Sequence, residues 1–159
     1  MIIYLVRHGS AEAGADDAAR RLSPRGREEV EAVARWVAAA RIEVAEIRHS
    51  GLARARESAE ILAARLAPPR GVREVGGLRP NDDPRPVRTE LAAARDPVML
   101  VGHLPQLARL ASLLLAGDPT AVPIRFAPGA VACLAREDDD GWALDWLVTP
   151  ALAGPGRPA

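Results

Sequence analysis

The chain has 159 residues, and its 21 basic side chains are balanced by 21 acidic ones. A chain of this length usually forms one domain, with a core large enough to fold without disulfides or metals. Because the charges cancel, no net charge attracts nucleic acid or an anionic membrane, and any anion site has to be built locally. We therefore expect one domain over residues 1–149 and a flexible tail, rich in proline and glycine, over 150–159.

The apolar residues do not form a targeting or membrane segment. The first apolar run, Met1 to Val6, stops at Arg7 and is too short for a signal-peptide core. No other stretch reaches the roughly 18 apolar residues that a membrane-spanning helix needs. Cys133, the single cysteine, lies in an apolar run and is predicted to be buried. We expect a bacterial cytoplasmic monomer with no nucleic-acid and no membrane partner.

Strand-like apolar runs alternate with helical periodicity along the chain. In chain order, the expected elements are a strand at 2–6, a helix from Pro24 to about Ala40, a strand at 44–49, a helix from about Ser50 to Leu66, a strand at 72–75, a helix ending near Arg95, a strand at 98–101, a helix from about Gly102 to Leu114, and strands at 130–134 and 142–148. This alternation predicts a three-layer α/β/α sandwich with a largely parallel central sheet.

The last two expected strands are predicted to form a hairpin. They flank the acidic segment DDDG at 138–141, which we expect to be a solvated turn. A calcium site at this turn is the alternative.

Polar residues follow three of the expected strands where each strand ends. Arg7 and His8 follow the first strand, Ser50 and Arg54 follow the second, and His103 follows the fourth. Open α/β sheets bind ligands at the carboxyl ends of their strands, so these side chains are expected to meet in one crevice. Helix N-termini at the same edge would add backbone donors.

This set of side chains suits a phosphoryl group better than a cation. A guanidinium fork matches phosphate oxygens bidentately. One histidine can be neutral and nucleophilic if its other ring nitrogen donates to a backbone carbonyl, while the second is protonated and shares the negative charge. The pattern therefore predicts phosphoryl chemistry that needs no metal and no other cofactor.

Three segments resemble motifs of the histidine phosphatase superfamily. Residues 7–9 (RHG) are similar to its R-H-G signature, and residues 101–103 (VGH) to the V-G-H that supplies its second histidine. Residues 50–59 (SGLARARESA) resemble its S-x-L-x-R-A-x-x-T-A segment, with Ser58 in place of threonine. The resemblance spans nearly the whole chain and implies a phosphoglycerate mutase-like fold and a phosphatase.

Within that superfamily the chain is most similar to the SixA-type phosphohistidine phosphatases. Residues 7–12 (RHGSAE) and 17–26 resemble the branch motifs R-H-G-x-A-E and D-x-x-R-P-L-T-x-x-G, with Arg21 replacing proline and Ser23 replacing threonine. The short chain has no room for the insertions that roof the site in the mutases, and an open site suits a protein substrate. The resemblance thus implies a phosphohistidine-bearing partner, such as a phosphotransfer domain of a signalling relay.

The resemblance also implies a role for each candidate residue. His8 would accept the phosphoryl group, and Arg7, Arg54 and His103 would bind its oxygens before water hydrolyses the intermediate. Arg20 is expected to contribute to substrate binding. The structural alternatives are a loop-capping His8, surface ion pairs for the arginines and a His103 that packs on the sheet.

A missing acid bears on the substrate. The mutase-like branch carries a glutamate in an L-x-E segment after the third strand, where this chain has LRP at 78–80. An alkoxide leaving group needs a positioned acid, worth on the order of 10²- to 10⁴-fold, whereas an imidazole is easier to expel. Glu12, Asp82 and Asp83 are the nearby acids, and none is placed in the catalytic set.

Two other residues and two other functions remain open. His49 is expected to be structural because no motif requires it, and Arg21 has no assigned role. A small-molecule phosphomonoesterase using Asp82 or Asp83 as its acid is one alternative function. A non-catalytic module that docks on phosphoproteins is the other, although binding alone would not require a nucleophile together with a second histidine.

Overall fold

The computed structural model describes residues 1–137 and 141–154, and its centre is a sheet with strand order β3-β2-β4-β1-β5-β6. The strands are β1 (Ile2–Arg7), β2 (Glu46–His49), β3 (Val72–Glu74), β4 (Val98–Gly102), β5 (Val131–Arg136) and β6 (Trp142–Val148). Strands β1 to β4 pair in parallel, while β5 pairs antiparallel with β1 and β6. The predicted mixed α/β fold with a largely parallel sheet is confirmed.

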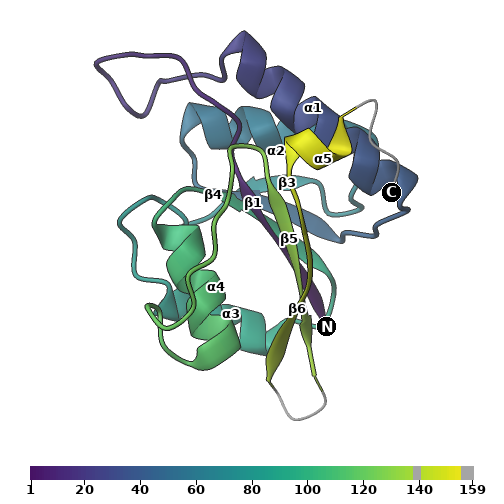
Figure 1. The fold of residues 1–159 in the computed structure, drawn as a ribbon, viewed down its shortest axis with the longest axis vertical. Coiled ribbons are helices and arrows are strands. Elements are labelled where there is room, and N and C mark those ends of the chain that lie inside the picture. Colours follow the sequence, from purple (N-terminus) through teal and green to yellow (C-terminus); the bar gives the residue numbers. More distant parts are fainter. Residues whose placement is uncertain (138–140, 155–159) are drawn as a thin grey trace.

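Helices cover both faces of this sheet. They are α1 (Pro24–Ala39), α2 (Ala53–Leu66), α3 (Arg85–Ala93), α4 (Gln106–Ala116) and α5 (Pro150–Ala153). Figure 1 shows α1, α2 and α5 on one side of the sheet and α3 and α4 on the other. The sheet is therefore the middle layer of a three-layer sandwich.

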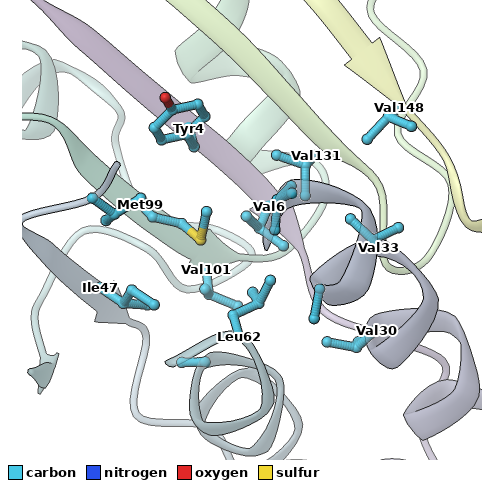
Figure 2. Close-up of a cluster of buried hydrophobic side chains, with 14 of the residues drawn as sticks. Tyr4, Val6, Val30, Val33, Ile47, Leu62, Met99, Val101, Val131 and Val148 are labelled. Carbon is cyan, nitrogen blue, oxygen red and sulfur yellow. The ribbon is translucent and has the colours of Figure 1, made fainter. Parts of the chain in front are cut away.

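The alternation of side chains along β1 explains why its sequence is apolar without interruption. Tyr4 and Val6 belong to the buried cluster under α1 and α2, which Figure 2 shows in close-up. Ile3 and Leu5 belong to the second cluster, against α3 and α4. Because successive residues of a strand point to opposite faces, a strand covered on both faces has to be apolar at every position.

The last described element of the chain is helical. Residues 150–153, expected to begin a flexible tail, form the short helix α5, which lies against α1. Pro150 suits the first helical position, and Ala153 packs against the cluster under α1. The acidic turn predicted at 138–140 and the tail at 155–159 lie outside the described residues.

The loop after β1 is held tightly against the start of α1. Ser23 caps this helix by accepting from the backbone N–H of Gly26, as the sequence predicted, and its own N–H donates to the carbonyl of Ser10. A Cβ atom on Gly9 would collide with the backbone of Gly26, and one on Gly26 would collide with Ser10. The two glycines thus allow a close backbone contact that fixes the loop containing His8.

Candidate active site

The carboxyl ends of β1, β2 and β4 bring the predicted catalytic side chains together. Arg7 ends β1 opposite Gly102, the last residue of β4, and His8 and His103 follow these two positions. The ring centroids of the two histidines are 4.7 Å apart. Arg54, in the first turn of α2, reaches His8 with an Nε–Nε2 distance of 3.3 Å. The site is therefore built at one edge of the sheet from three strand ends and one helix.

His8 is held as a neutral imidazole with one unprotonated ring nitrogen. Its Nδ1 lies 2.6 Å from the carbonyl oxygen of Gly9, which can only accept, so Nδ1 carries the proton. Its Nε2 then accepts from Nε–H of Arg54. Burial, followed by the positive charges of Arg54, Arg7 and Arg20, lowers the pKa of His8 to about 4, although the hydrogen bond to Gly9 raises it. Such a ring can attack an electrophile through Nε2 at neutral pH.

Arg54 is buried, with 5% of its surface exposed, and is fixed from its far side by Asp17. Its Nη1 donates to the Asp17 carbonyl oxygen (2.7 Å) and its Nη2 to Asp17 Oδ2 (3.1 Å). The bond from Nη2 lowers the pKa of the Asp17 carboxyl group. Because Asp17 holds the two terminal nitrogens, the Nε side of the guanidinium remains directed at His8.

A hydroxyl group joins the two segments that carry His8 and Arg54. Ser58 Oγ donates to the Arg54 carbonyl oxygen (2.7 Å) and accepts from the Gly9 N–H (3.3 Å). This residue replaces the threonine of the resembled motif, and the replacement retains the oxygen that makes both bonds.

Arg7 is bonded to the loop that leads to β5. Its Nη1 donates to the Phe126 carbonyl oxygen (2.7 Å). Its Nε is buried and has no hydrogen-bond partner within residues 1–137 and 141–154. Burial lowers the pKa of the guanidinium, which stays far above neutrality. Arg7 thus presents a fixed positive charge with an unused donor beside His8.

His103 is almost completely buried, and its environment differs from the sequence-based expectation. Burial, then the charges of His8, Arg54 and Arg7, lower its pKa to about 3, while Asp17 raises it. Without a bound anion, His103 is therefore neutral near pH 7, whereas the sequence pattern predicts a ring that is protonated and shares negative charge. The reason is that a third positive charge, buried beside the two arginines, is unfavourable.

Arg20 and Arg21 are adjacent in the sequence but do different things. Arg20 donates to the Glu12 carbonyl oxygen and to the Asp17 carboxylate, and it lies close enough to His8 to lower the pKa of that ring. Arg21 binds the buried carboxylate of Glu57 on α2 and so anchors the loop. Arg20 thus borders the site, while Arg21 has a structural partner.

The remaining candidate residues make hydrogen bonds that stabilise the local structure around them. Asp82 accepts from the Arg79 backbone N–H, and Asp83 accepts from that of Arg85 at the start of α3. Glu12 is exposed, with its backbone bonded to Arg21. His49 Nδ1 accepts from the N–H of Gly51 and holds the turn before α2, in line with the structural role expected of it.

Sequence reasoning placed Ser50 in the crevice without a partner and missed Asp17 and Phe126, the other two residues that orient the predicted ones. Asp17, Ser50 and Phe126 make the bonds that fix Arg54, His103 and Arg7. For Asp17 a signal existed, since it opens the resembled D-x-x-R segment. Phe126 contributes a backbone oxygen, which leaves no signal in the sequence.

The described residues contain neither a cluster of metal ligands nor a membrane-spanning helix. Within residues 1–137 and 141–154, no three His, Cys, Asp or Glu side chains are grouped so that they could hold a metal ion. No helix in this part of the chain is long and apolar enough to cross a membrane.

Comparisons with known proteins agree with the geometry. The model of the histidine phosphatase superfamily (branch 1) matches residues 3–79. The phosphohistidine phosphatase SixA of Escherichia coli K12 is 25% identical over 155 residues, which cover 94% of each chain. A solved structure of the protein histidine phosphatase SixA with tungstate has a TM-score of 0.85 at 25% identity, covering 95% of this chain and 98% of that one.

The fold is also shared with a more distant enzyme. A mycobacterial glucosyl-3-phosphoglycerate phosphatase, solved with inorganic phosphate, has a TM-score of 0.71 at 21% identity and covers 94% of this chain and 98% of its own.

Proposed function

The chain belongs to the SixA-type branch of the histidine phosphatase superfamily and is a phosphatase, and from this premise we propose that it hydrolyses phosphohistidine on a signalling protein. The observation that carries the proposal is the state of His8: Nδ1–H is bound to the Gly9 carbonyl, and the lone pair of Nε2 faces Arg54. His8 is the proposed phosphoryl acceptor, and Arg7, Arg54 and His103 are the proposed anion-binding residues.

In the first step, His8 Nε2 attacks phosphorus in line with the substrate nitrogen. A new P–N bond forms as the old one breaks, and the electron pair of the broken bond returns to the substrate imidazole. A phosphohistidine whose other ring nitrogen carries a proton leaves as neutral imidazole, so no enzyme acid is required. Arg7 and the Nε side of Arg54 stabilise the charge on the equatorial oxygens.

In the second step, water attacks the phosphorylated His8. The intermediate keeps its Nδ1–H, which is bonded to the Gly9 carbonyl, so the phosphorylated ring is positively charged and a good leaving group. Hydrolysis returns the electron pair to Nε2 and restores the neutral ring. The water proton passes to phosphate or solvent.

The placement of the acids favours a P–N bond over an alkyl ester. Asp82 and Asp83 are engaged by backbone N–H groups of their own loop. The name of the Escherichia coli relative, a phosphohistidine phosphatase, points to the same substrate class. We extend the proposal to a phosphohistidine-bearing protein partner, such as a phosphotransfer domain, with Arg20 at the rim as a contact, and to a monomeric cytoplasmic enzyme.

The test compares substrates at equal concentration. Release of phosphate is measured from a phosphohistidine-bearing phosphotransfer domain, from an aryl phosphate and from sugar phosphates, with the His8→Ala variant as the blank. We expect efficient hydrolysis of the phosphoprotein and slow hydrolysis of sugar phosphates. Faster turnover of a sugar phosphate than of the phosphoprotein would replace this function with that of a small-molecule phosphomonoesterase.

A further inference from the structure

Ser50 and His103 form a buried hydrogen-bonded pair at the deep end of the site. Each has 1% of its surface exposed, and Ser50 Oγ lies 2.6 Å from His103 Nε2. They follow β2 and β4, which are neighbours in the sheet with His49 opposite Val101. The pair therefore lies directly beyond the ends of two strands that are hydrogen-bonded to each other.

The other ring nitrogen of His103 lacks such a partner. Its Nδ1 is buried and makes no hydrogen bond within the described part of the chain. Buried polar atoms are nearly always hydrogen-bonded in folded proteins, so this nitrogen calls for an acceptor or donor from elsewhere. The ring of the proposed phosphoryl acceptor, His8, lies beside it at 4.7 Å between centroids.

The hydrogen bonds of Ser50 indicate which atom carries the proton between the two residues. Its Oγ accepts from the Leu52 N–H at 3.4 Å and lies 2.6 Å from His103 Nε2, so its single O–H proton is available to donate to that nitrogen. A nitrogen that accepts from a hydroxyl is unprotonated. In a neutral imidazole the one proton must then be on Nδ1.

We propose that Ser50 is a positioning residue that fixes His103 as its Nδ1-protonated tautomer, so that a neutral His103 donates from Nδ1 to an oxygen of the phosphoryl group. The inference rests on the proposed transfer to His8 and adds to it the form of the second histidine. A phosphoryl oxygen supplies the acceptor that Nδ1 lacks within the protein.

The charges around His103 are consistent with a neutral donor. Burial, followed by the charges of Arg54 and Arg7, disfavours a positive charge on this ring, and Asp17 favours it. The positive charge that binds the anion is supplied by the two arginines, and His103 contributes a directed hydrogen bond. The rate should therefore show no alkaline limb that arises from deprotonation of His103.

The experiment reads the tautomer directly. The chain has three histidines, His8, His49 and His103, so the ring nitrogens of protein labelled with ¹⁵N-histidine can be assigned with the His49→Gln and His103→Gln variants. Spectra are recorded at pH 7.5, alone and with vanadate. We expect His103 to be Nδ1-protonated in both states, and an Nε2-protonated or doubly protonated ring in both states would overturn the proposal.

Variants of Ser50 separate positioning from folding. Ser50→Ala should lower kcat for an aryl phosphate on the order of 10-fold and give His103 a mixture of tautomers, while Ser50→Thr, which keeps the hydroxyl, should restore both. Ser112 is the matched control, because its hydroxyl is equally buried but bonds Asp118 and Val122. Ser112→Ala should reduce stability without changing the His103 spectrum.

The outcomes also distinguish this inference from the proposed function. An unchanged tautomer and an unchanged kcat in Ser50→Ala would overturn the role of Ser50, whatever the natural substrate is. Hydrolysis of aryl phosphate without hydrolysis of phosphohistidine would overturn the substrate assignment alone. The tautomer measurement needs no substrate and decides the role of Ser50 in either case.

Discussion

The two histidines of the site are held in opposite ways. His8 lies beside Arg54, whose partner Asp17 has a side chain that is 60% exposed, and this half of the site is built from charged groups near solvent. His103 lies beside the buried hydroxyl of Ser50, and its half is built from neutral groups away from solvent. One anion site can thus combine positive charges that attract the anion with a hydrogen bond from a neutral group that orients it.

The largest expected effect comes from removing the nucleophile of the charged half. His8→Ala should lower kcat at least about 10³-fold on every phosphorylated substrate, because no other side chain can take the phosphoryl group. Phosphate release is measured by rapid quench, and circular dichroism checks the fold. His49→Ala is the control of the same residue type and should keep most of the activity. Near-normal turnover in His8→Ala would exclude His8 as the acceptor.

The next largest effect should follow removal of the guanidinium itself. Arg54→Ala should reduce kcat/KM on the order of 10²- to 10³-fold, since a buried, preorganised cation stabilises charge that develops on the phosphoryl oxygens. Arg54→Lys should recover little, because an ammonium group cannot bond Asp17 and the anion with the same fork. Arg25→Ala, which removes an exposed arginine paired with Glu29, is the control.

A smaller effect should result from releasing Arg54 on its far side. Asp17→Ala should raise KM by about 10-fold, because Nη2 loses its carboxylate partner, only the bond from Nη1 to the backbone carbonyl is left, and the guanidinium loses its orientation. Asp17→Asn keeps an acceptor and should lie between this variant and the wild type. Steady-state kinetics at 50 and 300 mM salt measure both, the lower salt exposing the charge. Tighter binding of phosphate to Asp17→Ala would instead show that this carboxylate competes with the anion.

The smallest effect concerns stability and pH. The pKa values of His8 and His103 are lowered by burial from 6.5 to about 4 and about 3, so below pH 6.5 the unfolded chain binds more protons than the folded one. This part of the stability is fully present above pH 6.5 and is lost as the pH falls towards 4. Thermal unfolding at intervals between pH 7.5 and 4 should show Tm falling over that window.

The variant His103→Gln tests the source of this slope. It removes one of the three histidines whose pKa is lowered by burial, so its Tm should fall less steeply between pH 6.5 and 4. An equal slope in the variant and the wild type would place the dependence elsewhere, in the carboxylates that are paired with arginines.

Periodicity and motifs were sufficient for the fold and the family. The apolar runs at 2–6 and 98–101 are central strands, and the Ser23-Pro24 signal starts α1 as predicted. The resemblance to the histidine phosphatase superfamily, inferred from three short segments, agrees with the comparisons: the family model matches residues 3–79, and the Escherichia coli SixA is 25% identical. Residues 150–153 form α5, because contacts with α1 favour a helix in a segment whose composition favours a loop.

The sequence by itself determined which side chains meet at the candidate site, since His8, Arg54 and His103 stand at strand and helix ends that a parallel sheet brings to one edge. Only the tertiary structure determined which ring nitrogen of each histidine is protonated and which residue binds each arginine. Those properties depend on single hydrogen bonds between residues far apart in the chain: 37 positions for Arg54 and Asp17, 53 for Ser50 and His103, and 119 for Arg7 and Phe126. Contacts at such separations depend on how the layers pack, which local patterns do not encode.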